Sequence, residues 1–187
     1  VRLFEEVAEA LGRPVDRSTL YQTLFTSALA GEADAGGLLA YNNLAGEPIT
    51  DLVEGRPMLI RTPDARFTLP NLMRSHLYAA LAALRIGMDV LLERERVQVD
   101  RLFGHGGFFK VPQVGQRMMA AAMDVPVSVM RTAGEGGAWG IALLAAFRLY
   151  RASGGDRSLE SWLDDVVFPG ASVTTAQPDP GDVALAQ

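Results

Sequence analysis

The sequence predicts an α/β domain in which helices flank a sheet. Long segments with apolar residues at helical spacing alternate with short apolar runs that glycine, asparagine or proline bounds. This alternation is typical of helices that cover a sheet. Of the 187 residues, 49% are hydrophobic and 21% are charged, which is enough apolar material for one buried core.

The chain begins with two expected helices. Residues 1–11 have apolar side chains at helical spacing, and Gly12 ends the pattern. Ser18 is the expected N-cap of a second helix over residues 19–30.

The longest helical pattern covers residues 69–95, between short apolar runs. Thr68 or Asn71 is its expected cap, and Pro70 suits the first turn. Before it, residues 37–42 predict a buried strand, and a second short strand is expected at 58–61.

The second half of the sequence alternates strands with helices. We expect strands at 99–103 and 125–130, and helices at 113–123, 137–152 and 159–167, with loop after residue 167. The strands are few for one sheet, and residue 1 already lies in a helix. We therefore expect residues 1–187 to be one lobe fragment, cut at both ends.

Composition excludes several classes of protein. A net charge of −5 argues against a nucleic-acid partner and an anionic membrane surface, which both require a basic face. The absence of cysteine excludes disulfides and cysteine-based zinc sites, and His76 and His105 lack metal-ligand spacing. No uninterrupted apolar run approaches the roughly 20 residues that span a bilayer, and no secretory signal is seen. We expect a cytoplasmic protein.

The segment LFGHGGFFKVPQVGQRMMA, residues 102–120, is the strongest candidate for a ligand site. Gly104, Gly106 and Gly107 follow a predicted strand, so a ligand can lie against bare backbone. The start of the next helix, residues 113–116, favours anions. The segment predicts a nucleotide site without a Walker A loop, and a plain strand-to-helix turn is the alternative.

Two other segments carry weaker signals. TAGEGGAWGIALLAAF, residues 132–147, predicts a glycine-containing loop that could face a nucleotide, followed by a helix packed closely on the sheet. Glu47 in the loop NNLAGEPI is expected to be a surface carboxylate. His76, inside the longest helix, is expected to have a packing or surface role.

In order and spacing, these stretches resemble the C-terminal domain of FGGY-family carbohydrate kinases over residues 1–151. LLAYNNLAGEPI is similar to the family's apolar strand and GERxP-like loop, although its arginine is missing, so that loop receives no role here. The long helix follows, then the Gly106-Gly107 turn and a helix containing Gln116. WGIALLA resembles the family's GAAxLA helix, and GGFFKVPQVGQ looks most like the ketopentose kinases.

The resemblance implies an RNase H-like domain of the actin-like ATPase superfamily, with ATP and Mg²⁺ as cofactors. It implies that Gly106 and Gly107 lie against the nucleotide. Val111 stands where relatives place an adenine-side residue, often asparagine, which suggests an apolar contact here. The expected pocket is completed by three flanking residues: His105, Phe108 and Lys110.

The resemblance also implies what lies elsewhere. The catalytic aspartate and most sugar contacts of such kinases belong to an N-terminal lobe, so no catalytic residue is expected in this chain. The expected function is phosphorylation of a sugar hydroxyl, with a ketopentose such as xylulose or ribulose as substrate. The expected partners are that lobe and, for oligomerisation, a second copy. The alternatives are a lobe of a non-metabolic actin-like ATPase switch and a degenerate kinase that binds without turnover.

Overall fold

The computed structural model describes residues 1–131, 134 and 136–186. Its helices and strands follow in the order α1 (Arg2–Ala10), α2 (Arg17–Ser27), η1 (Ala28–Ala30), η2 (Ala35–Gly37), β1 (Leu38–Tyr41), η3 (Pro48–Thr50), β2 (Met58–Arg61), α3 (Leu69–Asp89), η4 (Val90–Arg94), β3 (Leu102–Gly104), η5 (Gly107–Phe109), α4 (Val114–Met123), β4 (Val127–Met130), α5 (Gly136–Ala152), α6 (Leu159–Trp162), η7 (Leu163–Val167), β5 (Val173–Ala176) and α7 (Pro180–Ala186). A helix or strand is therefore confirmed at each predicted place, with shifts of a few residues at the ends. The prediction that the strand at 37–42 is buried is only partly right, because Leu39 of β1 is 62% exposed.

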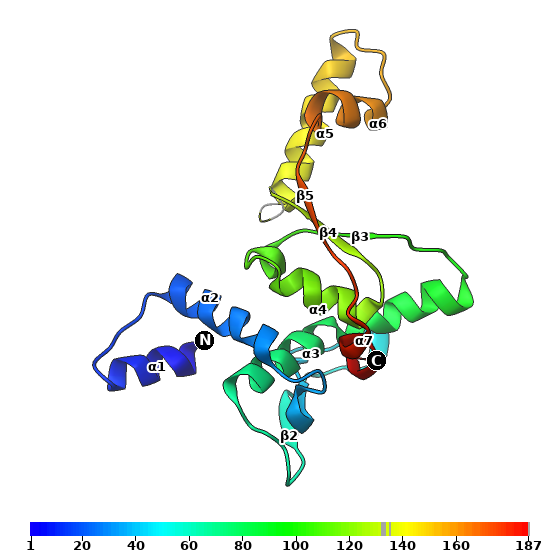
Figure 1. Cartoon of the computed structure of the whole chain (residues 1–187). Coiled ribbons are helices and arrows are strands. Elements are labelled where there is room, and N and C mark those ends of the chain that lie inside the picture. Colours follow the sequence, from blue (N-terminus) through cyan, green and yellow to red (C-terminus); the bar gives the residue numbers. More distant parts are fainter. Residues whose placement is uncertain (132–133, 135, 187) are drawn as a thin grey trace.

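Helix α3 lies at the centre of the molecule and packs against α2, α4 and β1 (Figure 1). Of the two predicted caps, Thr68 and Asn71, the structure has Thr68. Its hydroxyl accepts a hydrogen bond from the backbone N–H of Asn71 at 3.4 Å. Asn71 itself is buried, and its Oδ1 accepts from the N–H of Glu32 at 2.8 Å. Val114 and the methionines of α4 fill the space beside Leu77 and Leu81 to form the main core.

The cap predicted for α2 is wrong. Asp16 caps this helix, because its carboxylate accepts a hydrogen bond from the N–H of Thr19 at 3.0 Å. A carboxylate and a serine hydroxyl are both good caps, so residue type alone did not separate Asp16 from Ser18.

By length and composition, the helix Leu69–Arg94 could cross a membrane. No uninterrupted apolar run of this length exists in the sequence, because Arg74 and Arg85 lie within the helix. Here both arginines bind groups of the fold: Arg74 lies in a buried ion pair with Asp182, and Arg85 donates to the carbonyl of Ala122 at 2.9 Å. In this structure, Leu77, Leu81 and Met88 of the helix belong to the core cluster, while 22% of its apolar window is buried.

The strands form two sheets instead of one. Strands β1 and β2 pair antiparallel, while β3 pairs parallel with β4, and β4 pairs antiparallel with β5. The prediction of loop after residue 167 is wrong, since β5 and α7 lie there. Strand β5 is mostly exposed and has no apolar alternation, so only its pairing with β4 identifies it as a strand.

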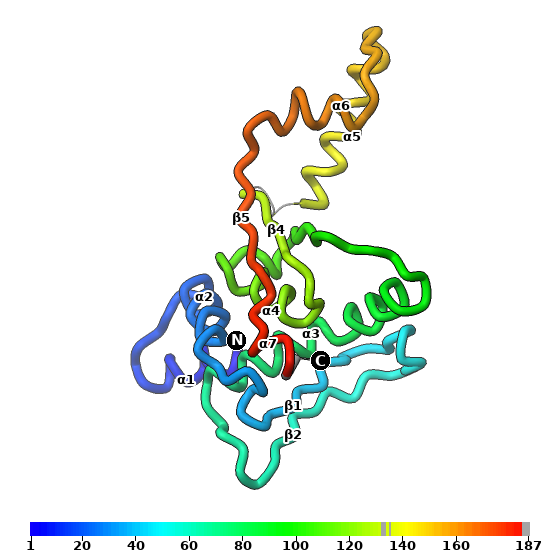
Figure 2. Tube along the Cα trace, turned by 45° about the vertical axis from the view of Figure 1, so that its right-hand side comes forward, coloured from blue at the N-terminus to red at the C-terminus, as the bar shows by residue number. Residues whose placement is uncertain are grey.

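The final helix, α7, is tied to the core by a polar cluster around Arg74. Although its side chain is only 3% exposed, Arg74 forms an ion pair with Asp182 of α7. It also donates to the carbonyl of Gly31 and to the hydroxyl of Tyr78, both at 2.9 Å. This cluster joins α7 to α3. Helix α7 also packs against α4 (Figure 2).

Helices α5 and α6 project from the body of the molecule (Figures 1 and 2). The prediction that residues 141–147 pack closely on the sheet is wrong, because Ile141 is 72% exposed and Leu144 is 57% exposed. Within the projection, Phe147 and Trp162 lie 5.5 Å apart between ring centroids. The glycines and alanines of α5 would allow a sheet to pack closely on this helix. No sheet of the described structure covers Ile141 and Leu144, so their side chains remain exposed.

Candidate functional site

The glycine turn after β3 leaves its backbone open. A Cβ atom added at Gly106 or Gly107 would meet no other atom of the described chain within 4 Å. Gly106 has a φ of +95°, which side chains rarely adopt, so the fold itself requires glycine there. Gly107 has no such backbone strain, and its lack of a side chain leaves space that the fold does not use.

Packing around the turn keeps it in place. A Cβ at Gly104 would collide with the ring of Phe109, and one at Gly115 would collide with the carbonyl of Phe108. The two phenylalanine rings meet edge to face, 5.4 Å apart. The turn is therefore folded tightly onto the start of α4, while its outer surface remains open.

The structure brings the two predicted glycine segments together. A Cβ at Gly136 would come within 2.7 Å of His105, and one at Gly134 would come within 3.4 Å of Lys110. Residues 132, 133 and 135 of the second segment lie outside the described residues. Gly134 and Gly136 thus lie beside the turn after β3, although about 30 residues separate them from Gly104 and Gly106 in the sequence.

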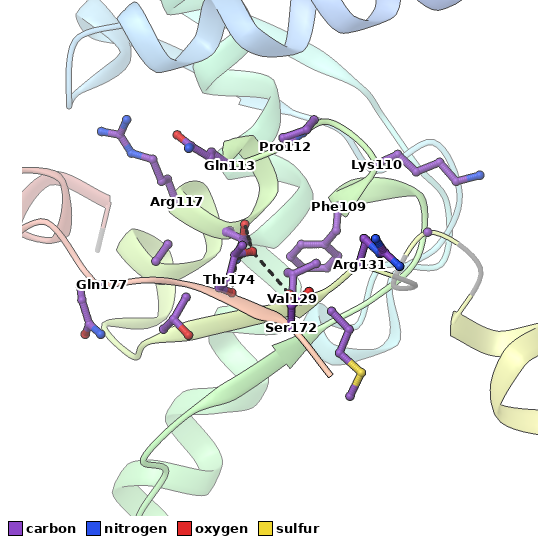
Figure 3. A pocket seen from close by; sticks show the side chains of 15 residues that line it. Phe109, Lys110, Pro112, Gln113, Arg117, Val129, Arg131, Ser172, Thr174 and Gln177 are labelled. Carbon is purple, nitrogen blue, oxygen red and sulfur yellow. Dashed lines mark hydrogen bonds between the residues drawn. The ribbon is translucent and has the colours of Figure 1, made fainter. Parts of the chain in front are cut away.

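A cavity of about 770 Å³ lies on one side of the turn, between the start of α4 and strands β4 and β5 (Figure 3). Lys110, Arg117 and Arg131 all border it, and its described lining has no acidic side chain. Figure 3 shows the side chains of Lys110 and Arg117 extending in different directions. The cavity is therefore positive at its rim, but its cations do not converge on one point.

Gln116 has a structural role beside this cavity. Its buried side-chain amide donates to the carbonyl of Thr174 at 2.7 Å and so connects α4 to β5. Gln113, the N-cap, has a left-handed backbone and makes no capping bond with its side chain. The expectation of an anion site at residues 113–116 stays a prediction.

A second cavity, of about 460 Å³, separates the turn from α2. Lys110, Val111 and Pro112 form one wall. The opposite wall consists of four residues of α2: Arg17, Ser18, Tyr21 and Gln22. The sequence pattern of α2 predicts only a helix. It gives no sign of this wall, because α2 and the turn lie about 90 residues apart in the sequence.

The predicted site residues fall into three groups. Gly106, Gly107 and Lys110 have access to solvent or to the cavities. His105 borders a third, mainly apolar cavity of about 540 Å³ between β3 and α5. Phe108 is half-buried and packs against the core.

Val111 belongs to the core cluster with an exposure of only 6%, although it also borders the α2 cavity. Its apolar character therefore has a packing reason, and a contact with adenine stays a prediction.

The remaining candidates have local structural roles. Glu47 accepts a hydrogen bond from the N–H of Ile49 at 3.3 Å in a turn, in agreement with a surface loop carboxylate. His76 pairs through Nδ1 with the side-chain oxygen of Asn42 at 2.8 Å, and burial lowers the pKa of His76. Within residues 1–131, 134 and 136–186, no three carboxylate, imidazole or thiol side chains could hold a metal ion together.

Comparison with known proteins identifies similar domains. Residues 2–149 match the sequence profile described as the FGGY family of carbohydrate kinases, C-terminal domain. Comparison with curated proteins gives no significant match.

Solved structures share the fold. The ligand-bound xylulose kinase from Lactobacillus acidophilus has a TM-score of 0.67 at 19% identity, over 88% of this chain and 31% of that one. The gluconate kinase from the same organism has a TM-score of 0.67 at 20% identity, over 88% of this chain and 31% of that one. The xylulose kinase from Rhodospirillum rubrum has a TM-score of 0.64 at 22% identity, over 91% of this chain and 31% of that one.

These structures confirm the predicted fold class, an α/β domain of the actin-like ATPase type. At these identities the likeness establishes the fold alone. The chain spans about a third of the length of these structures.

Proposed function

Because the chain belongs to the FGGY family of carbohydrate kinases, whose C-terminal domain it matches, we propose that it supplies part of the nucleotide-binding lobe of an ATP-dependent sugar kinase. One observation carries the placement of the site: the backbone at Gly106 and Gly107 is open, and cavities lie beside the same turn. Bare backbone allows a phosphate to approach N–H groups that a side chain would cover.

In this proposal, residues 1–187 hold and orient ATP, and an N-terminal lobe supplies the catalytic base and most sugar contacts. The reaction is an in-line transfer of the γ-phosphoryl group to a sugar hydroxyl, from which the base removes the proton. The division between two lobes is consistent with the share of the solved kinases that this chain covers. Catalysis then depends on bringing the two lobes together.

Among the described residues, no group of three or more carboxylate, imidazole or thiol side chains could coordinate Mg²⁺. Magnesium in kinases is held largely by substrate phosphates, water and one or two carboxylates. We therefore assign none of this chain's residues to the metal, and the metal is proposed only as a companion of ATP.

The proposed sugar is a ketopentose such as xylulose or ribulose. Supporting this choice, GGFFKVPQVGQ resembles the ketopentose kinases, and several similar structures are xylulose kinases. A gluconate kinase is equally similar in fold, so the choice needs a direct test.

The test is a coupled ADP-release assay of the complete two-lobe protein with ketoses, polyols and sugar acids. We expect the highest kcat/KM with a ketopentose. ADP release with a sugar acid alone would contradict the substrate, and no sugar-dependent ADP release would contradict the kinase activity.

Gly107→Val tests the placement of the nucleotide. The new side chain has room in the fold, so the variant should remain folded while its branches occupy the space proposed for ATP. We expect ATP affinity to fall with sugar binding largely intact. Unchanged ATP affinity would show that the nucleotide lies elsewhere.

A further inference from the structure

The cavity between α2 and the glycine turn has the composition of a site for a nucleotide base. We infer that Tyr21 and Gln22 of α2 form the base-side wall of the ATP site and set its preference among nucleotides. This inference rests on the proposed kinase function and adds to it two residues outside the glycine segments.

The four α2 residues share one face of the helix. Arg17 and Tyr21 are four residues apart, as are Ser18 and Gln22, so each pair lies one turn apart. The cap by Asp16 fixes the start of this helix directly before the cavity. All four side chains border the cavity opposite Lys110 and Pro112.

The side chain of Tyr21 is held in place by Phe25, one turn further along α2. Its ring stacks on Phe25 with centroids 4.2 Å apart and an angle of 23° between the planes. Phe25 in turn packs against the core cluster. Tyr21 is 37% exposed, so part of it remains available to a ligand. Its partial burial raises the pKa of its hydroxyl.

The polar groups of the cavity suit the rest of a nucleotide. Gln22 offers both an amide donor and a carbonyl acceptor, which can pair with the edge of a base. Arg17 adds positive charge, although its Nε also lies 3.5 Å from the carboxylate of Glu5. None of the residues that border the cavity in the described structure is acidic.

The glycine turn connects this cavity to the proposed phosphate position. The N–H of Lys110 donates to the carbonyl of Gly107 at 3.2 Å, so Lys110 follows the open backbone within one turn. A nucleotide with its phosphates along Gly106 and Gly107 can therefore direct its base toward Tyr21. An aromatic ring stacks on any base, whereas Gln22 distinguishes bases by their hydrogen-bonding edges.

The experiment compares Tyr21→Ala, Tyr21→Phe and Gln22→Ala in the complete two-lobe kinase. Base–aromatic stacking corresponds to factors of roughly 5 to 150 in affinity. We expect Tyr21→Ala to weaken ATP binding about tenfold and to raise KM for ATP, with KM for the sugar unchanged. Tyr21→Phe keeps the ring and should bind ATP within about twofold of the parent.

Base preference separates a binding role from a packing role. We expect Gln22→Ala to reduce the ratio of kcat/KM for ATP to kcat/KM for CTP and GTP, which a loss of packing would not change. Thermal melts of all three variants establish that they fold. An unchanged ratio in Gln22→Ala would overturn the role of Gln22.

Two outcomes distinguish failure of this inference from failure of the proposed function. If Tyr21→Ala binds ATP like the parent while Gly107→Val does not, the α2 wall is wrong and the glycine site stands. If neither variant changes ATP affinity, the proposed placement of the nucleotide is wrong as well. Equal losses for ATP and sugar in Tyr21→Ala would indicate only a packing role and would overturn the inference.

Discussion

The buried ion pair between Arg74 of α3 and Asp182 of α7 is expected to contribute measurably to the free energy of unfolding. Asp182→Ala removes the carboxylate and leaves the guanidinium with its bonds to Gly31 and Tyr78. A hydrogen bond to a charged group contributes about 1.5–3 kcal/mol, so we expect a loss of about 2 kcal/mol. Arg74→Met also strands the carboxylate of Asp182, which is only 16% exposed, and should cost about 3 kcal/mol or more.

The assay is thermal and urea unfolding of the chain, followed by circular dichroism. For a domain of this size, a loss of 2 kcal/mol lowers Tm by about 4–8 °C. The matched control is Glu54→Ala, which breaks the exposed pair with Arg56. Exposed pairs contribute little, so its Tm should hardly change.

A definite result would refute this reasoning. Asp182→Ala with the same Tm as the Glu54→Ala control would show that α7 does not depend on the pair. An Arg74→Met variant more stable than the parent would show that desolvation of the two charges outweighs their attraction.

Three further predictions concern the turn, a histidine and the isolated chain. Gly106 combines φ +95° with ψ −174°, a backbone conformation almost confined to glycine, so Gly106→Ala should lower the free energy of unfolding by about 1–3 kcal/mol. Gly107→Ala should leave Tm unchanged, and equal melts for the two variants would contradict the assigned backbone difference. Burial lowers the pKa of His76, so near pH 6 the unfolded state binds more protons than the folded state. The free energy of unfolding should therefore fall as the pH drops below about 6.5. A His76→Gln variant with the same pH dependence as the parent would exclude this cause. The isolated chain should bind ATP weakly or undetectably by calorimetry, since the proposed site needs a second lobe; sub-micromolar affinity would disprove that division.

Local sequence patterns were sufficient to predict most elements of the fold. Helical spacing identified α3, and its cap at Thr68 follows from residue type and position. Glycine without a side chain identified the turn after β3 as a place where backbone is exposed. These features depend on neighbours within a few residues, so the sequence by itself determined them.

Contacts between distant segments could not be predicted in this way. Pairing with β4 makes β5 a strand, and the packing of Val111 into the core depends on α3 and α4. The wall of Tyr21 and Gln22 faces Lys110 only because the fold brings α2 beside the turn. The sequence alone determined where the backbone is bare, because that is a property of glycine; only the tertiary structure decided which side chains face it, because those contacts form between segments about 90 residues apart.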